Sequence, residues 1–249
     1  MSNLLIVLFG LAVGISVGLT GVGGGSFLTP FLVIVMRIHP AVAVATSLVF
    51  TLITRAVGSV QHLRQGTVDF RVVRQVAIGS IPAAVVASVV LSRFLSGTNS
   101  SDTVRARLIQ ACLLVAACVL TYRLLVPAKP GHGNNDPIKL ALLGILVGAM
   151  VAVASVGSGS VAVAGLVGLT SLPIARVVGT DMVHALILAA VATPLTLLQT
   201  TFDAHLALLL LLGSIPGVVI GSRLAVLVPE RFTRVTVTLA VWTLALKVA

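Results

Sequence analysis

The sequence predicts an all-α polytopic membrane protein made of two inverted repeats, and three observations support this prediction. Hydrophobic residues occupy 58% of the 249 positions and charged residues 9%, whereas soluble domains carry about 25% charged residues. Several apolar stretches reach the length of about 20 residues that a helix needs to cross a bilayer. The second half of the chain also repeats the first, since Gly79-Ser80-Ile81-Pro82 recurs as Gly213-Ser214-Ile215-Pro216.

This duplication keeps one offset of 134 residues along most of the chain. It relates Gly23-Gly24-Gly25-Ser26 to Gly157-Ser158-Gly159-Ser160, Thr46 to Thr180, Gln65 to Gln199 and Asp69 to Asp203. Residues 1–126 are therefore predicted to form the first repeat and residues 138–249 the second. The segment 127–137 is rich in Pro, Gly and Asn, which predicts a linker loop because such a run cannot continue a helix.

Each repeat is predicted to contain about four apolar segments. They cover residues 4–36, 40–61, 72–95 and 104–126 in the first half, and 138–170, 174–198, 204–227 and 232–248 in the second. The first segment of each half is too long for one span, because about 33 helical residues extend for about 50 Å and the hydrocarbon core is ~30 Å thick. Glycine-rich runs lie in the middle of both long segments. We therefore expect each to be a broken helical hairpin.

The basic residues are expected to orient the protein in the cell membrane rather than to bind nucleic acid. The formal net charge is +10, but Lys and Arg lie mostly in short connections between apolar segments. Cytoplasmic loops of membrane proteins are enriched in these residues. With a hairpin in each half, one side of the bilayer holds about twice as many basic residues as the other, which favours inverted halves with both termini outside. Cys112 and Cys118 lie within one apolar segment, so neither a disulfide framework nor a metal site is expected. We expect no cofactor.

The two glycine-rich tips are candidate anion-binding elements. A helix broken inside a bilayer leaves backbone N–H groups that protein, water or a ligand must satisfy, and the helix start carries partial positive charge. The residues concerned are Gly23, Gly24, Gly25 and Ser26 in the first half, and Gly157, Ser158, Gly159 and Ser160 in the second. The alternative is that these small residues only allow helices to pack closely.

Arg55, Asp181 and His184 lie well inside apolar segments, whereas the other Asp, His, Lys and Arg residues of these segments lie near a segment end. Arg55 must face protein, water or a counter-anion, and its planar fork suits the oxygens of a carboxylate, sulfonate or phosphate. Alternatively, Arg55 forms a structural pair with Asp181 or extends to the interface from a shallow depth. Asp181 and His184 share one helix face and are candidates for coupling transport to protons. They could instead be an interfacial pair bonded to neighbouring backbone.

The order and spacing of several motifs resemble one known family. These motifs are Gly21-Val22-Gly23-Gly24-Gly25-Ser26 with Pro30, Pro40 with Ala43-Val44-Ala45-Thr46-Ser47-Leu48, His62-Leu63-Arg64-Gln65-Gly66-Thr67-Val68-Asp69, and Gly79-Ser80-Ile81-Pro82. The chain is similar to the sulfite exporter TauE/SafE family over nearly its whole length. This resemblance implies export of sulfite, sulfoacetate or related organosulfur anions.

Together these observations predict a non-enzymatic secondary transporter that exports a small sulfur-containing oxyanion by alternating access, with proton coupling. Arg55 and the tip N–H groups would bind the anion, and hydroxyls of Thr46, Ser47 and Thr180 would add contacts. The alternatives are an anion channel, an intramembrane serine hydrolase that uses Ser158 or Ser160 with His184, and a non-catalytic membrane subunit. A homodimer is compatible with the sequence but does not follow from it.

Overall fold

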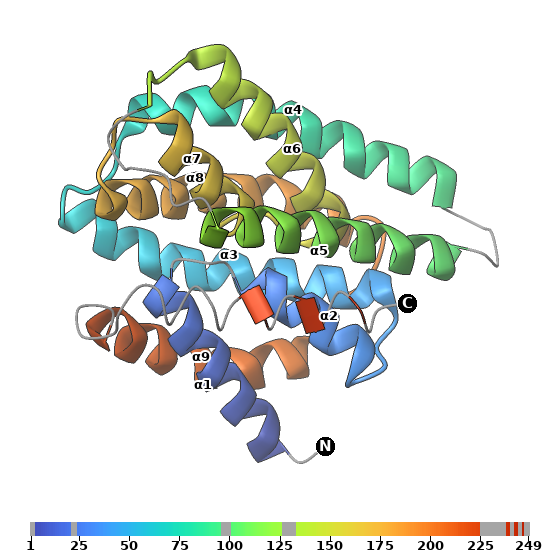
Figure 1. Ribbon diagram of the computed structural model, residues 1–249. Coiled ribbons are helices and arrows are strands. Elements are labelled where there is room, and N and C mark those ends of the chain that lie inside the picture. Colours follow the sequence, from blue (N-terminus) through green and yellow to red (C-terminus); the bar gives the residue numbers. More distant parts are fainter. Residues whose placement is uncertain are drawn as a thin grey trace.

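The protein is a bundle of α-helices. The computed structural model describes residues 3–20, 24–95, 101–125 and 133–224, together with positions 238, 239, 242, 243 and 246. Within these ranges the helices are α1 (Asn3–Thr20), α2 (Gly25–Ile34), α3 (Pro40–Arg64), α4 (Phe70–Leu95), α5 (Ser101–Leu125), α6 (Pro137–Ala154), α7 (Val161–Leu169), α8 (Ile174–Leu197) and α9 (Ala204–Leu224) (Figure 1). The described part of the chain contains no strand, so the predicted all-α class is confirmed.

Six of the described helices, α3, α4, α5, α6, α8 and α9, are long and apolar enough to cross a membrane. Their outward surfaces are apolar as well. Large hydrophobic side chains such as Ile78, Phe94 and Leu142 are more than half exposed, as expected where lipid is the solvent. The last predicted segment, residues 232–248, lies almost entirely outside the described residues.

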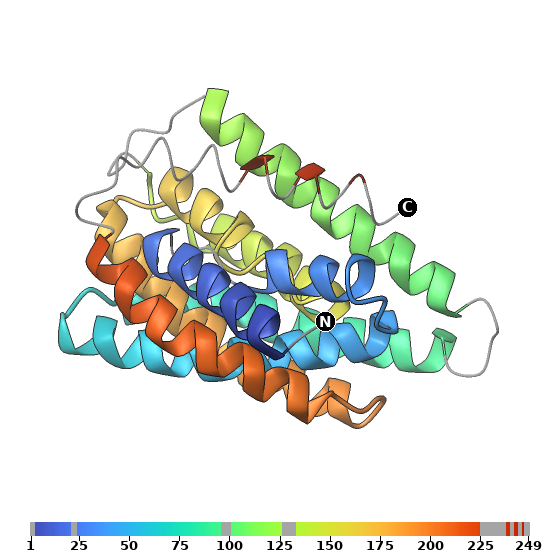
Figure 2. The same cartoon turned by 90° about the horizontal axis from the view of Figure 1, so that it is seen from below.

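The first apolar segment of each half is broken, as predicted. In the first half, α1 ends before the glycines and α2 begins at Gly25; in the second, α6 ends at Ala154 and α7 begins at Val161. The second break contains Ser155 (φ 57°), Gly157 (φ 114°) and Gly159 (φ 84°), and a left-handed backbone stops an α-helix. In the first half α2 runs back toward the end at which α1 begins (Figure 2). Phe9 of α1 stacks on Phe31 of α2 with ring centroids 3.5 Å apart, which holds the two arms together.

Local signals set where several helices begin. Proline occupies the first turn of α3 and of α6, where its missing N–H has no intrahelical partner to lose. The Asp136 carboxylate caps α6 by accepting a hydrogen bond from Ile138 N at 2.9 Å. Asp69 caps α4 through Val72 N at 3.2 Å, and its repeat equivalent Asp203 caps α9 through Leu206 N at 2.9 Å.

Each half packs its first helix against a helix of the other half, and the two contacts are equivalent. Helix α1 lies along α9, and its equivalent α6 lies along α4, the equivalent of α9. Glycines bring these backbones together: Gly10 and Gly14 face the carbonyl groups of Leu210 and Ser214, while Gly144 and Gly148 face those of Val76 and Ser80. Every one of these contacts recurs at the 134-residue offset. Small residues allow this close approach in membrane helices.

At the centre, α3 packs against its equivalent α8. The two helices run antiparallel, because Arg55 lies beside Asp181 whereas His62, farther along α3, lies beside the earlier residue Gly179. Two further hydrogen bonds join the halves, each at the start of a helix. Thr46 Oγ1 accepts a hydrogen bond from Asp203 N at 3.1 Å, and the equivalent Thr180 Oγ1 accepts one from Asp69 N at 3.0 Å.

Candidate functional site

The centre of the bundle contains a buried ion pair. Arg55 of α3 and Asp181 of α8 have side-chain exposures of 1% and 0%, and Arg55 Nη1 lies 3.4 Å from Asp181 Oδ2. The same Nη1 lies 3.0 Å from the sulfur of Met182. Arg55 Nη2 and Asp181 Oδ1 have no hydrogen-bond partner among the described residues. In a bidentate pair, two guanidinium N–H groups donate to the two carboxylate oxygens. This pair has only one such contact, so Arg55 Nη2 remains an open donor and Asp181 Oδ1 an open acceptor.

The two glycine-rich breaks meet next to this pair. Gly25 at the start of α2 contacts the backbone carbonyl of Ser155, so the first break touches the second. A side chain at Gly25 would collide with that carbonyl. Gly24 faces the ring of Phe50. The backbone amide of Gly159 faces the Asp181 carboxylate without giving Oδ1 a partner of normal hydrogen-bond geometry. The breaks and the ion pair therefore form one continuous cluster between the halves.

Several hydroxyl groups of the central bundle are buried without a hydrogen-bond partner in the part of the chain that the structure describes. Three of them, Ser26, Ser47 and Ser160, belong to residues that the sequence predicted as part of the site. Three others were not predicted, namely Thr29, Thr51 and Ser155. Buried polar atoms are nearly always paired with protein or water. Each of these unpaired hydroxyls is therefore available to a water molecule or a polar ligand.

His184 lies one turn after Asp181 on α8 and is 2% exposed. Its Nε2 lies 2.8 Å from Ser80 Oγ of α4, and its Nδ1 has no partner among the described residues. The contact between Ser80 and His184 does not amount to a catalytic triad, because no described carboxylate orients Nδ1 and Asp181 is paired with Arg55. The hydrolase alternative required His184 beside Ser158 or Ser160, whereas its described partner is Ser80.

The structure gives the remaining predicted site residues different surroundings. Thr46 and Thr180 are buried, and both hydroxyls accept backbone N–H groups of the opposite half. Ser158 is 5% exposed and lies in the second break with Gly157. Gly23 lies outside the described residues. The predicted residues that come together at the centre are thus Gly24, Gly25, Arg55, Gly159 and Asp181.

Some polar residues near the centre were missed although the sequence contained a signal for them. Ser80 stands in the duplicated Gly-Ser-Ile-Pro motif, which indicated the repeat but was not interpreted as part of a site. Asp69 and Asp203 entered the sequence analysis as equivalent positions of the repeat and not as site residues. Each of them caps a helix, and its backbone N–H donates to a threonine of the other half. The Thr and the Asp of these contacts are identical between the repeats. That identity was the available signal.

The chain matches one family model and several known membrane proteins. The family model described as sulfite exporter TauE/SafE matches residues 6–248. The probable membrane transporter protein YjnA of Bacillus subtilis is 39% identical over 227 residues, which cover 88% of this chain and 89% of that protein. The probable membrane transporter protein YdhB of the same organism is 25% identical over 235 residues, which cover 91% and 92%. No solved structure matches the chain.

Proposed function

Because the chain belongs to the sulfite exporter TauE/SafE family of membrane transporters, we propose that it exports a small sulfur-containing oxyanion from the cell. Sulfite, sulfoacetate and related organosulfonates are the proposed substrates. Transport is secondary, coupled to protons, and proceeds by alternating access. The observation that carries this proposal is Arg55, a buried guanidinium with an open Nη2 at the contact between two broken helices.

The chemistry around Arg55 suits an oxyanion. Guanidinium N–H groups form strong charge-assisted hydrogen bonds to sulfonate and sulfite oxygens. The helix starts of α2 and α7 add partial positive charge, and the unpaired hydroxyls of Ser26, Ser47 and Ser160 supply neutral donors. Burial in a low dielectric strengthens each of these contacts relative to water. Asp181 or His184 carries the coupled proton.

The packing of the two halves supports alternating access. Equivalent central helices α3 and α8 run antiparallel, and each half contributes one break and one partner of the ion pair. We propose that the halves are inverted across the bilayer, so that rocking one half against the other exposes the central cluster to each side in turn. The described helices of the two halves then play equivalent roles on opposite sides.

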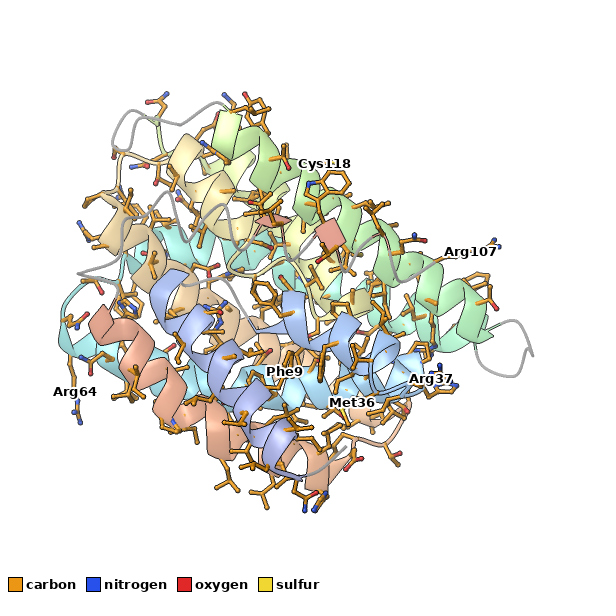
Figure 3. The ribbon with its side chains drawn as sticks, turned by 60° about the horizontal axis from the view of Figure 1, so that its bottom comes forward. Phe9, Met36, Arg37, Arg64, Arg107 and Cys118 are labelled. Atoms are coloured by element: carbon orange, nitrogen blue, oxygen red, sulfur yellow. The ribbon has the colours of Figure 1, made fainter. Side chains whose placement is uncertain are left out.

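This topology can be tested with single cysteines. Arg64 lies at the opposite end of the molecule from Arg37 and Arg107 (Figure 3). The loop between α3 and α4 adjoins Arg64, Arg71 and Arg74, whereas the equivalent loop 198–203 has no basic residue, so the positive-inside rule places the first in the cytoplasm. With Cys112 and Cys118 replaced, we expect an impermeant maleimide to label Thr200→Cys in intact cells and Gln65→Cys only after lysis. Labelling of both from outside would contradict inverted halves.

The transport proposal is tested by flux in proteoliposomes. We expect purified protein to move sulfite and a short organosulfonate such as methanesulfonate, and an imposed pH gradient to change the rate. Heat-treated protein in the same lipid is the control. Turnover far above that of transporters, unaffected by the gradient, would indicate an anion channel. Absence of flux for both anions with folded protein would reject this substrate class.

A further inference from the structure

The charge balance of the buried central cluster limits which ligands can bind there. Arg55 and Asp181 contribute one positive and one negative charge, and both are at most 1% exposed. The pair is therefore neutral when no ligand is bound. Moving a net charge into a low-dielectric interior is costly unless a counter-charge accompanies it. Any ligand that enters must therefore leave the cluster close to neutral, or be disfavoured.

The helices packed against α8 bring no other described charge to the centre that could compensate a bound anion. Helix α8 packs against α3, α4, α6 and α7. On α3 the other ionisable groups are His62 and Arg64, toward the end of the helix; on α4 the three arginines are exposed. Helix α6 carries only Lys139, which is 64% exposed, and α7 carries no ionisable side chain. On α8 itself, Arg176 is exposed at 43% and pairs with Asp69, and His184 bonds to Ser80.

An anion on Arg55 would place two negative charges around one guanidinium, unless Asp181 takes up a proton. The geometry suits that exchange of partners. The existing pair has a single contact of 3.4 Å, while Arg55 Nη2 and Asp181 Oδ1 are both unpaired. A protonated Oδ1 becomes a donor, so the anion would accept one hydrogen bond from Nη2 and one from the carboxylic acid. The proton binds to the carboxylate oxygen, and no covalent bond of the anion is broken.

Building on the anion transport proposed above, we propose that the site takes up a monoanion and one proton together, with the proton on Asp181. Transport is then electroneutral cotransport, so the anion's own outward concentration gradient, and not the inward proton gradient, drives export. The opposite scheme, exchange of an anion for a proton, would alternate between a cluster with one excess negative charge and one with an excess positive charge. Cotransport alternates between two neutral states, which a buried site favours. A dianion would leave one uncompensated charge, so among the substrates proposed above hydrogensulfite and monosulfonates are preferred over sulfoacetate, which carries two negative charges at neutral pH.

Methanesulfonate is the suitable probe, because it carries one charge and no titrating proton, so that any proton moved is carried by the protein. In wild-type proteoliposomes with a trapped pH indicator, we expect one proton to move with each methanesulfonate in the same direction. The flux should not respond to a membrane potential set with valinomycin. Methanedisulfonate should move at least about tenfold more slowly. Proton movement in the opposite direction, or voltage-driven flux without protons, would overturn cotransport, whereas no anion flux at all would instead reject the proposed function.

Two variants assign the proton carrier. Asp181→Asn mimics the protonated acid, and we expect methanesulfonate flux to lose its proton and to become voltage-driven. His184→Gln tests the other candidate carrier on the same helix: whatever its effect on the rate, one proton should still move with each anion if Asp181 is the carrier. If His184→Gln removes the proton movement while Asp181→Asn keeps it, Asp181 is not the carrier. The wild-type proton count remains decisive even if either variant fails to fold.

Discussion

Replacing Arg55 by alanine is expected to abolish transport of sulfite and methanesulfonate. The guanidinium is the one cation that the described residues place inside the central cluster. Hydrogen bonds to charged groups contribute about 1.5–3 kcal/mol each. Since about 1.4 kcal/mol corresponds to a factor of ten, loss of one such bond lowers the flux at least about tenfold, and loss of the charge lowers it further. Initial rates of uptake into proteoliposomes measure this effect.

The controls must separate loss of transport from loss of folding. In Arg55→Ala the Asp181 carboxylate stays buried without a partner, and breaking a buried pair in this way costs about 3–5 kcal/mol. The double variant Arg55→Ala with Asp181→Asn removes both charges and should recover stability in a thermal unfolding assay without recovering transport. Arg55→Lys keeps the charge but lacks the planar fork, so intermediate rates are expected. Wild-type flux in the folded double variant would show that Arg55 has only a structural role.

Replacing Gly14 or Gly148 by leucine is expected to cause a large loss of stability. A Cβ at Gly14 would collide with the backbone of Ser214, and a Cβ at the equivalent Gly148 would collide with that of Ser80. Backbone cannot move aside as a flexible side chain can, so α1 must separate from α9, or α6 from α4. Overpacking typically costs about 1–3 kcal/mol, and we expect these variants to lie at or above the top of that range. The midpoint of thermal unfolding in detergent measures the effect.

Ala12→Leu is the matched control for Gly14→Leu. Ala12 lies on the same helix, two residues away, and is exposed, so leucine there should leave the unfolding midpoint nearly unchanged. Because the Gly14 and Gly148 contacts are equivalent in the two halves, we expect their variants to lose similar amounts of stability. A Gly14→Leu protein as stable as Ala12→Leu would mean that α1 does not pack against α9 as described.

Much of the fold could be predicted from the sequence because its causes are local. The glycine-rich runs predicted both helix breaks, since positive φ at Gly157 and Gly159 is cheap for glycine and costly for other residues. The positions of α3, α4, α8 and α9 followed from apolar length bounded by proline and polar loops. In contrast, the role of Thr46 and Thr180 as acceptors for the opposite half could not be predicted, because each bond joins residues more than one hundred positions apart.

The candidate site could likewise be predicted only in part from the sequence. Arg55 and Asp181 stood out in the sequence because an ionisable residue in an apolar segment is costly in lipid. Their pairing was only one of the alternatives that the sequence left open. Nothing in the sequence predicted that Ser80 would bond to His184, or that Thr29, Thr51 and Ser155 would be buried without partners among the described residues.

By itself, the sequence determined that this protein is an all-helical, duplicated membrane protein with a broken helix in each half. These properties depend on segment length, composition and backbone preference, which each stretch of chain carries alone. The tertiary structure alone decided that the first break touches the second, that Arg55 meets Asp181, and that one donor and one acceptor of this pair stay open. Those contacts depend on how helices from different halves rotate and cross, and packing between distant segments sets that geometry.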